Sequence, residues 1–359
     1  MSSTPACADP APVERGPALL DVSKLRVEFQ TRQGPVVAID EVSFTMAPGE
    51  ILGVVGESGA GKSLTGLAII GLLDEAARIA GGRITFEGER IDDLPEIRMR
   101  RLRGRRIGAI FQDPLTALNP LFTVGRQLVE TIRTHLPLDA EQAHRRAVEL
   151  LKETGIPGAE QRMHEYPHQF SGGMRQRVVI ALALAGEPHL LIADEPTTAL
   201  DVSVQAQVLG LLERIGREHG TAVMLVTHDM GVIAQACDRV AVMYAGRIVE
   251  IGPVDAVVNA SAHPYTAGLM GAITPIDEDF ARLVQIDGSM PRPGQVPPGC
   301  AFHPRCPHAF NRCTRERPDL MPAGSSQAAC WLHAPDERAR LLAAGLASTA
   351  DASSPGELA

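Results

Sequence analysis

The stretch Gly56-Glu57-Ser58-Gly59-Ala60-Gly61-Lys62-Ser63 decides the fold class of this chain. It has the form GxxxxGK[ST], in which a glycine-rich loop turns its backbone N–H groups toward the phosphates of a nucleotide. In such loops the lysine reaches the β- and γ-phosphates, and the hydroxyl group after it ligates Mg²⁺. Lys62 and Ser63 are therefore predicted to contact a nucleoside triphosphate and its metal ion, and residues 56–61 to surround the phosphates.

The sequence on both sides of the loop matches the structure that such a loop requires. Residues 51–55 form a short, wholly apolar run, which is typical of a parallel strand buried on both faces. After the loop, Leu64, Leu67, Ile70 and Leu73 recur at helical spacing. The order strand, glycine-rich loop, helix is the context in which this motif binds phosphate.

A second apolar run ends in two carboxylates. Residues 190–193 are apolar, and Asp194 and Glu195 follow them directly. A carboxylate at the end of such a strand lies beside the metal ion of the nucleotide, so Asp194 is predicted to bind Mg²⁺. Glu195 lies one residue further along and is predicted to polarise the attacking water as a general base.

Two other segments complete the expected parallel layer. Residues 222–227 form another apolar run, and residues 125–153 are expected to form an amphipathic helix. Strands that alternate with helices in this way indicate a parallel α/β sheet.

The N-terminal part of the chain has a different pattern. Leu25, Val27 and Phe29 alternate with polar neighbours, as in a half-buried strand. Residues 36–39 and 42–44 are expected to form two more strands of the same antiparallel layer.

The composition limits the class of protein. Hydrophobic residues make up 45% of the 359 residues, which is enough for a sizeable core. The net charge of −9 argues against general nucleic-acid binding, because phosphate backbones require basic surfaces. No run of 18 apolar residues is present and the N-terminus lacks the apolar segment of a signal peptide, so a cytoplasmic protein is expected.

Four further strings resemble the remaining motifs of the ABC ATPases, enzymes that bind ATP between two subunits. Ser171-Gly172-Gly173-Met174-Arg175-Gln176 is similar to their signature, although glutamine is commoner than methionine at its fourth position. Ile110-Phe111-Gln112-Asp113-Pro114 looks like their glutamine loop, and Val226-Thr227-His228-Asp229 like their switch histidine loop. Thr198-Ala199-Leu200-Asp201 is similar to their D-loop. All of the motifs occur in the order of that family, between residue 19 and about residue 253.

The resemblance implies a role for each motif. Gln112 would sense Mg²⁺ or water at the metal site, and His228 would hold the γ-phosphate during hydrolysis. Ser171-Gly172-Gly173 would contact the γ-phosphate that the opposite subunit binds, and Asp201 would belong to the D-loop. Phe29 would stack on the adenine ring; the alternative is that it is an ordinary core residue.

Longer stretches resemble the ATP-binding subunits of the dipeptide and oligopeptide permeases. These are residues 111–120, 166–170, 174–177, 263–266 and 304–307. The resemblance implies a bacterial importer, with this chain as a peripheral ATPase at the cytoplasmic face of the inner membrane. Its partners would be a second ATPase subunit, identical or paralogous, two transmembrane permease subunits and an extracytoplasmic peptide-binding protein. Nickel importers share this subfamily, so nickel or another small solute is the alternative cargo.

Four cysteines near the C-terminus are candidates for a metal centre. Cys300, Cys306, Cys313 and Cys330 leave gaps wider than the CxxC pairs of zinc fingers, and four thiolates can also hold an iron–sulfur cluster. The subfamily resemblance favours a [4Fe–4S] cluster. Zn²⁺ and unligated thiols are the alternatives, and disulfides are not expected in the cytoplasm.

These observations predict an α/β fold of the ABC type, with an antiparallel β subdomain, a helical subdomain and a small Cys/Pro-rich C-terminal module. The expected regions are a disordered tail at 1–17, the ATPase domain at 18–253, the C-terminal extension at 254–335 and a flexible tail at 336–359. A soluble ABC ATPase of translation or DNA repair is the remaining alternative. The first kind carries two ATPase halves in one chain, and the second inserts long coiled coils or zinc modules between the motifs; neither feature is visible here.

Overall fold

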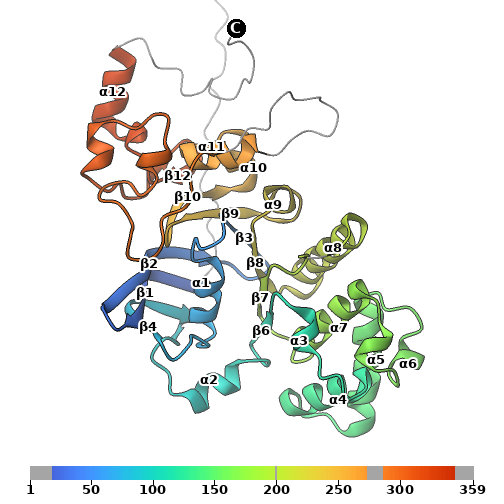
Figure 1. Ribbon diagram of the computed structural model, residues 1–359. Coiled ribbons are helices and arrows are strands. Elements are labelled where there is room, and N and C mark those ends of the chain that lie inside the picture. Colours follow the sequence, from blue (N-terminus) through green and yellow to red (C-terminus); the bar gives the residue numbers. More distant parts are fainter. Residues whose placement is uncertain (1–17, 199, 273–285, 344–359) are drawn as a thin grey trace, which may run out of the picture.

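The computed structural model describes residues 18–198, 200–272 and 286–343 of the chain. The tail predicted at residues 1–17 lies outside this part, as do residues 344–359 of the tail predicted at the C-terminus. The described residues form an antiparallel sheet, a larger mixed sheet, a group of helices beside that sheet and a C-terminal module on its opposite edge (Figure 1).

The antiparallel sheet has the order β2-β1-β4-β5. Its strands are β1 (Leu20–Thr31), β2 (Gly34–Met46), β4 (Ala77–Phe86) and β5 (Glu89–Arg90). The two separate strands predicted within residues 36–44 were wrong, because β2 is continuous. Its register with β1 shifts between the pairs Leu25–Val42 and Val27–Ile39, and Glu41 has a φ of +55°. This irregularity breaks the apolar alternation and explains why the sequence pattern is interrupted there.

The larger sheet has the order β11-β12-β10-β9-β3-β8-β7-β6. Its strands are β3 (Ile51–Val55), β6 (Ile107–Ile110), β7 (Leu190–Asp194), β8 (Ala222–Thr227), β9 (Arg239–Tyr244), β10 (Arg247–Pro253), β11 (Met321–Ala323) and β12 (Ser326–Ala328). Strand β3 lies between β8 and β9 and is parallel to both. All five of its residues are buried, which confirms the prediction of a central strand.

Both faces of the larger sheet are covered. Ile51 and Val55 of β3 pack into the core shared with the helical region, and Leu52 and Val54 pack into the core shared with the antiparallel sheet. This split follows from the alternation of side chains along a strand. The phosphate loop after β3 therefore starts from a strand that is held on both faces.

The helices before and after the helical region in the chain are α1 (Lys62–Ile69), α2 (Glu96–Leu102), α3 (Pro114–Ala117), α8 (Val202–His219), α9 (Met230–Ala236), α10 (Val254–Asn259) and α11 (Pro264–Gly271). The helical region contains α4 (Val124–His135), α5 (Ala140–Glu153), α6 (Ala159–Arg162) and α7 (Gly172–Leu184). The single helix predicted over 125–153 was wrong. Asp139 caps α5 in a capping box with Gln142, and the proline at position 137 interrupts the helix before it.

The C-terminal region extends the larger sheet. The hairpin of β11 and β12 pairs with β10 through Glu250–Ala328 and Ile251–Gln327. Three short 3₁₀ turns, η2 (His303–Arg305), η3 (Asn311–Thr314) and η4 (Trp331–His333), precede helix α12 (Pro335–Ala343). Residues 336–343, which were expected to begin a flexible tail, are therefore helical. None of the helices in the described part of the chain has the length and apolar character that crossing a bilayer requires.

Candidate nucleotide-binding site

The phosphate loop has a conformation that depends on its glycines. Gly56, Gly59 and Gly61 have φ values of +155°, +84° and +104°. A Cβ atom added at Gly56 would lie 2.2 Å from the backbone oxygen of Met243, so no other residue fits between the loop and β9. The loop is fixed from the same side by a hydrogen bond from the Gly246 N–H to the Ala60 carbonyl, 2.9 Å long.

Lys62 is buried at the start of α1 and points back into the loop. Its Nζ donates to the carbonyl oxygens of Gly56, at 2.8 Å, and Glu57, at 3.2 Å. Burial lowers the pKa of Lys62, whereas the charges of Glu195 and Asp194 act in the opposite direction. The phosphates of a nucleotide in the loop would offset this cost of burying a charged lysine. Contact with those phosphates is the role predicted for Lys62.

Ser63 and Asp194 meet at the carboxyl end of β7. The Ser63 hydroxyl donates to Oδ1 of Asp194 over 2.9 Å, although the two residues are 131 positions apart. Burial raises the pKa of Asp194, and the bond from Ser63 partly opposes that rise. A hydroxyl and a carboxylate side by side are oxygen ligands of the kind that Mg²⁺ prefers, so these two residues fit the predicted metal ion.

Glu195 is the point where three motifs meet. Its Oε2 accepts hydrogen bonds from Gln112 Nε2 at 3.0 Å and from the Thr198 hydroxyl at 2.9 Å, and its Oε1 lies 3.1 Å from His228 Nδ1. Burial alone would raise the pKa of Glu195, but the bonds with His228 and Thr198 lower it below its ordinary value. The carboxylate is therefore held ionised and oriented by its neighbours.

The backbone at Glu195 is also unusual. Its φ is +48°, in the left-handed region that a non-glycine residue occupies at a cost of about 1–3 kcal/mol. Its N–H donates to the Val226 carbonyl on the neighbouring strand over 2.8 Å. Neither this conformation nor the contact with Thr198 was predicted, because both depend on how the chain turns at the end of β7.

The signature begins at the exposed N-terminus of α7. Ser171 caps α7 by accepting a hydrogen bond from the Met174 N–H at 3.3 Å, and Gly172 is exposed. A Cβ at Gly173 would lie 2.6 Å from Val204 of α8, whose N-terminus Asp201 caps. The structure thus brings the signature and the D-loop together and leaves both facing outward.

Phe29 occupies a half-buried position on β1. It is paired with Val36 of β2 and Ala77 of β4. A partly exposed aromatic ring is compatible with both stacking on adenine and ordinary packing, so its role stays a prediction.

The four C-terminal cysteines line one small pocket together with aromatic and histidine side chains, among them Phe302 and His263. All four are free thiols, and burial raises the pKa of Cys300 to about 11 and that of Cys330 to about 12. Within residues 18–198, 200–272 and 286–343, however, no group of three or more His, Cys, Asp or Glu side chains is arranged to hold a metal ion. The predicted metal centre is therefore not confirmed, either as a [4Fe–4S] cluster or as a Zn²⁺ site.

Comparison with known proteins agrees with this geometry. Residues 39–198 match the family model described as ABC transporter, and residues 249–313 match the one described as oligopeptide/dipeptide transporter, C-terminal region. A putative peptide import ATP-binding protein of Brucella abortus (strain 2308) is 47% identical over 319 residues, which are 89% of this chain and 96% of the relative. The oligopeptide transport ATP-binding protein OppD of Salmonella typhimurium (strain LT2) is 49% identical over 84% of this chain and 89% of its own length.

A solved structure shares the fold of the larger part of the chain. The dimeric ATP-binding cassette MJ0796, in a post-hydrolysis state bound to ADP and Pi, is 29% identical with a TM-score of 0.59. The match covers 66% of this chain and 98% of that protein. Together with the site geometry, these similarities show that the chain belongs to the ABC transporter family, as an ATP-hydrolysing subunit of its oligopeptide/dipeptide transporter branch.

Proposed function

We propose that this chain hydrolyses ATP to drive the uptake of di- or oligopeptides through a bacterial ABC importer. The observation that carries the proposal is the convergence of Gln112, Thr198 and His228 on the carboxylate of Glu195, next to the Ser63–Asp194 pair. The cargo follows from the C-terminal region, which matches the oligopeptide/dipeptide transporter model, and from relatives named for peptide import and oligopeptide transport.

The proposed reaction follows from the positions of these side chains. Lys62 and the N–H groups of the loop bind the β- and γ-phosphates. Ser63, Asp194 and Gln112 would hold Mg²⁺, which neutralises charge on the β- and γ-phosphates. Glu195 accepts a proton from the attacking water molecule. The water oxygen forms a bond to the γ-phosphorus, and the bond between the γ-phosphorus and the β-phosphate oxygen breaks. His228 donates to the γ-phosphate as ADP leaves.

A complete site requires a second ATPase subunit, which can be an identical chain or a paralogue. Ser171 and Gly172 are exposed, and the Ser171 hydroxyl accepts a hydrogen bond from the Met174 N–H of its own helix. We propose that they bind the γ-phosphate held by the partner. The dimeric state of MJ0796 supports this arrangement.

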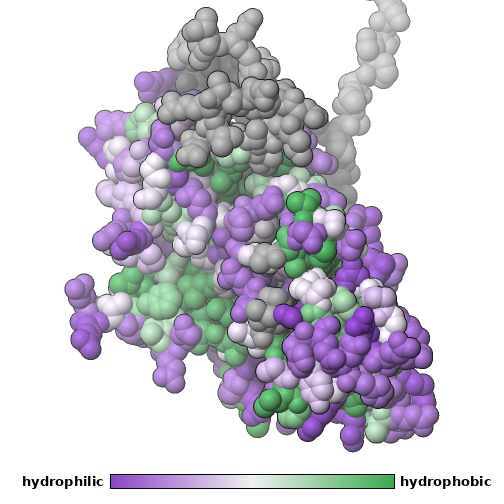
Figure 2. Space-filling model, turned by 45° about the vertical axis from the view of Figure 1, so that its right-hand side comes forward, coloured by the Kyte–Doolittle hydropathy of each residue, from purple (hydrophilic) through white to green (hydrophobic). Residues whose placement is uncertain are grey.

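The other proposed partners are two transmembrane permeases and an extracytoplasmic peptide-binding protein. The chain would then lie at the cytoplasmic face of the inner membrane as a peripheral subunit. Two exposed apolar residues flank α3 in the sequence. Phe111 precedes the helix and Leu121, which is 78% exposed, follows it. Figure 2 shows that hydrophobic residues of the displayed face gather in patches among hydrophilic ones. We propose that the exposed apolar residues near α3 contact the permease.

The four-cysteine module would carry a [4Fe–4S] cluster. Support comes from the single pocket that Cys300, Cys306, Cys313 and Cys330 share. A bound cluster would cross-link a segment whose other ordered elements are short 3₁₀ turns and a small hairpin.

Uptake measurements distinguish the proposed cargo from its alternative. Cells that lack this chain should lose uptake of a radiolabelled tripeptide, and the wild-type chain should restore it, whereas Glu195→Gln should not. Radiolabelled nickel should enter equally in all three strains. Loss of nickel uptake with unchanged peptide uptake would replace peptides with nickel as the cargo.

A further inference from the structure

The C-terminal region reaches the phosphate loop directly. The Arg305 guanidinium lies 3.1 Å from the carboxylate of Glu57, the second residue of the loop, across 248 positions of sequence. The Arg305 side chain is only 7% exposed and that of Glu57 is 29% exposed, so the ion pair is largely shielded from water. Such a pair is screened less by water and salt than one on the open surface.

Tyr265 of α11 holds the backbone of the same residue. The N–H of Glu57 donates to the Tyr265 hydroxyl over 2.9 Å, and Tyr265 is fully buried. Burial raises the pKa of Tyr265, so the phenol keeps its proton at physiological pH. The main chain and the side chain of Glu57 are thus both fixed by residues outside the ATPase motifs.

Arg305 is itself fixed by its surroundings. Its Nε donates to the Asp287 carbonyl at 2.8 Å and its Nη2 to the Ile286 carbonyl at 3.2 Å. The guanidinium also lies within 6 Å of the ring centres of Tyr244 and Phe302, which pack edge to face. This aromatic group connects Arg305 with the pocket of the four cysteines, because Phe302 lines that pocket.

A carboxylate in a phosphate-binding loop places a negative charge close to the negative charges of the phosphates. An unpaired Glu57 would repel the phosphates of ATP, whereas the ion pair with Arg305 cancels its charge. We propose that Arg305 is a positioning residue of the ATP site: it neutralises Glu57 and, with Tyr265, keeps the phosphate loop in its binding conformation. The inference rests on ATP binding at this loop and does not depend on the cargo or on the cluster.

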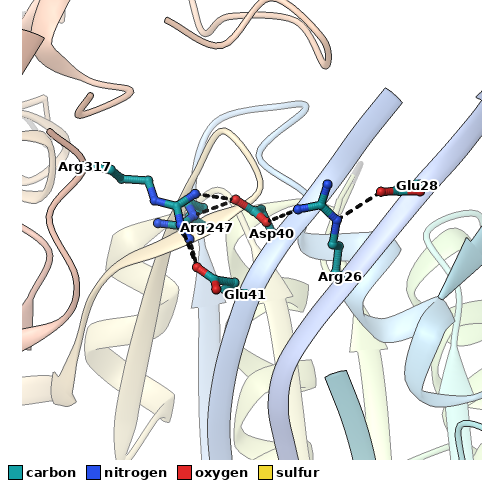
Figure 3. Close-up of polar contacts among 6 residues, drawn as sticks. All are labelled: Arg26, Glu28, Asp40, Glu41, Arg247 and Arg317. Atoms are coloured by element: carbon teal, nitrogen blue, oxygen red, sulfur yellow. Dashed lines mark hydrogen bonds and ion pairs between the residues drawn. The ribbon is translucent and has the colours of Figure 1, made fainter. Parts of the chain in front are cut away.

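A second ionic contact holds the same module without touching the loop. Arg317 donates to Asp40 over 2.6 Å and to Glu41 over 2.7 Å, and Arg247 of β10 pairs with the same two carboxylates (Figure 3). Arg26 of β1 also binds Asp40, at 2.9 Å. Arg317 therefore docks the module on the antiparallel sheet and provides a matched control for Arg305.

The test is the affinity of the purified full-length chain for a fluorescent ATP analogue. Arg305→Gln should raise the Kd about threefold to thirtyfold, which is less than the full loss of one charged hydrogen bond, because Arg305 acts on ATP only through the loop. Arg305→Lys should recover part of the affinity, because it restores the charge without the planar fork. Arg317→Gln should stay within about twofold of the wild type, and thermal unfolding of each variant verifies that it is folded.

The charge of Glu57 makes a rescue experiment possible. Combining Glu57→Gln with Arg305→Gln removes the unpaired carboxylate, so the double variant should bind ATP more tightly than Arg305→Gln alone. An unchanged Kd in Arg305→Gln would overturn the inference, as would a double variant no better than the single one or an equal loss in Arg317→Gln. Failure of the wild-type chain to bind the analogue would instead contradict the ATPase assignment itself.

Discussion

Oε1 of Glu195 lies 3.1 Å from Nδ1 of His228, and the other carboxylate oxygen of Glu195 is bonded to Gln112 and Thr198. His228 is 62% exposed at its side chain, whereas Glu195 is only 16% exposed. The carboxylate is therefore largely enclosed by protein groups, whereas the histidine side chain is open to solvent. This pairing brings the residue proposed as the general base next to the residue proposed to hold the γ-phosphate.

The hydrogen bonds to Glu195 predict the acid limb of the pH profile. Burial raises its pKa, but bonds with His228 and Thr198 bring it below the ordinary value, so the base stays ionised into mildly acidic solution. Activity should be present above this pKa and be lost as the pH falls through it. Thr198→Val removes one of the bonds, so the acid limb of kcat should move to higher pH.

Thr198→Ser is the matched control for this prediction, because it keeps the hydroxyl group. Its profile should overlay that of the wild type. If Thr198→Val moved the acid limb to lower pH, or left it in place, the hydrogen bond would not set the pKa of Glu195.

The outward position of Ser171 predicts that the active site is shared between two chains. The isolated subunit should be a poor ATPase at high dilution, and its specific activity should rise with concentration or on adding the partner subunits, because ATP bridges two subunits. Turnover and light scattering measured on the same samples test this. Full specific activity from a sample that light scattering shows to be monomeric would contradict it.

Leu121 is predicted to contact the permease. Leu121→Asp should abolish most peptide transport by the assembled complex and leave the Kd for ATP within about twofold, since Leu121 makes no core contact in the described structure. Ile97→Asp is the control, because Ile97 is also exposed, at 66%, but lies on α2. Equal loss of transport in both variants, or loss of ATP binding in Leu121→Asp, would refute the assignment.

The four-cysteine module is predicted to bind iron and sulfide. Protein purified without oxygen should be brown, absorb near about 400 nm and contain about four irons per chain. Cys313→Ser should lose this absorption, and Cys237→Ser, which changes a buried thiol packed outside the pocket, should keep it. Colourless anaerobic protein with one zinc per chain would contradict the cluster.

The motifs were predictable from sequence because each is short and local. The glycine spacing of residues 56–61 and the carboxylates after β7 require particular residue types at fixed offsets, and the structure brings Lys62, Ser63 and Asp194 together as expected. The signature and switch motifs were recognised through their resemblance to a family. His228 lies beside Glu195, whereas the contact of the signature with a second subunit stays a prediction.

Other features could not be predicted, because they depend on contacts between distant parts of the chain. Arg305 and Tyr265 have no local pattern that points to Glu57, more than 200 residues away. The shift of register near Glu41 could not be predicted either, because it is defined by the pairing of β2 with β1. The helix at 335–343 was missed although Pro335 at its first position and the acidic Asp336 and Glu337 in its first turn are signals of a helix start.

The most direct test of the central claim is the ATP turnover of Glu195→Gln in the assembled transporter. The substitution keeps the shape of the side chain and removes the base, so turnover should fall about 10²- to 10⁴-fold while the Kd for ATP stays near that of the wild type. Turnover near the wild-type rate would contradict the assignment of Glu195 as the general base, and with it the account of this site.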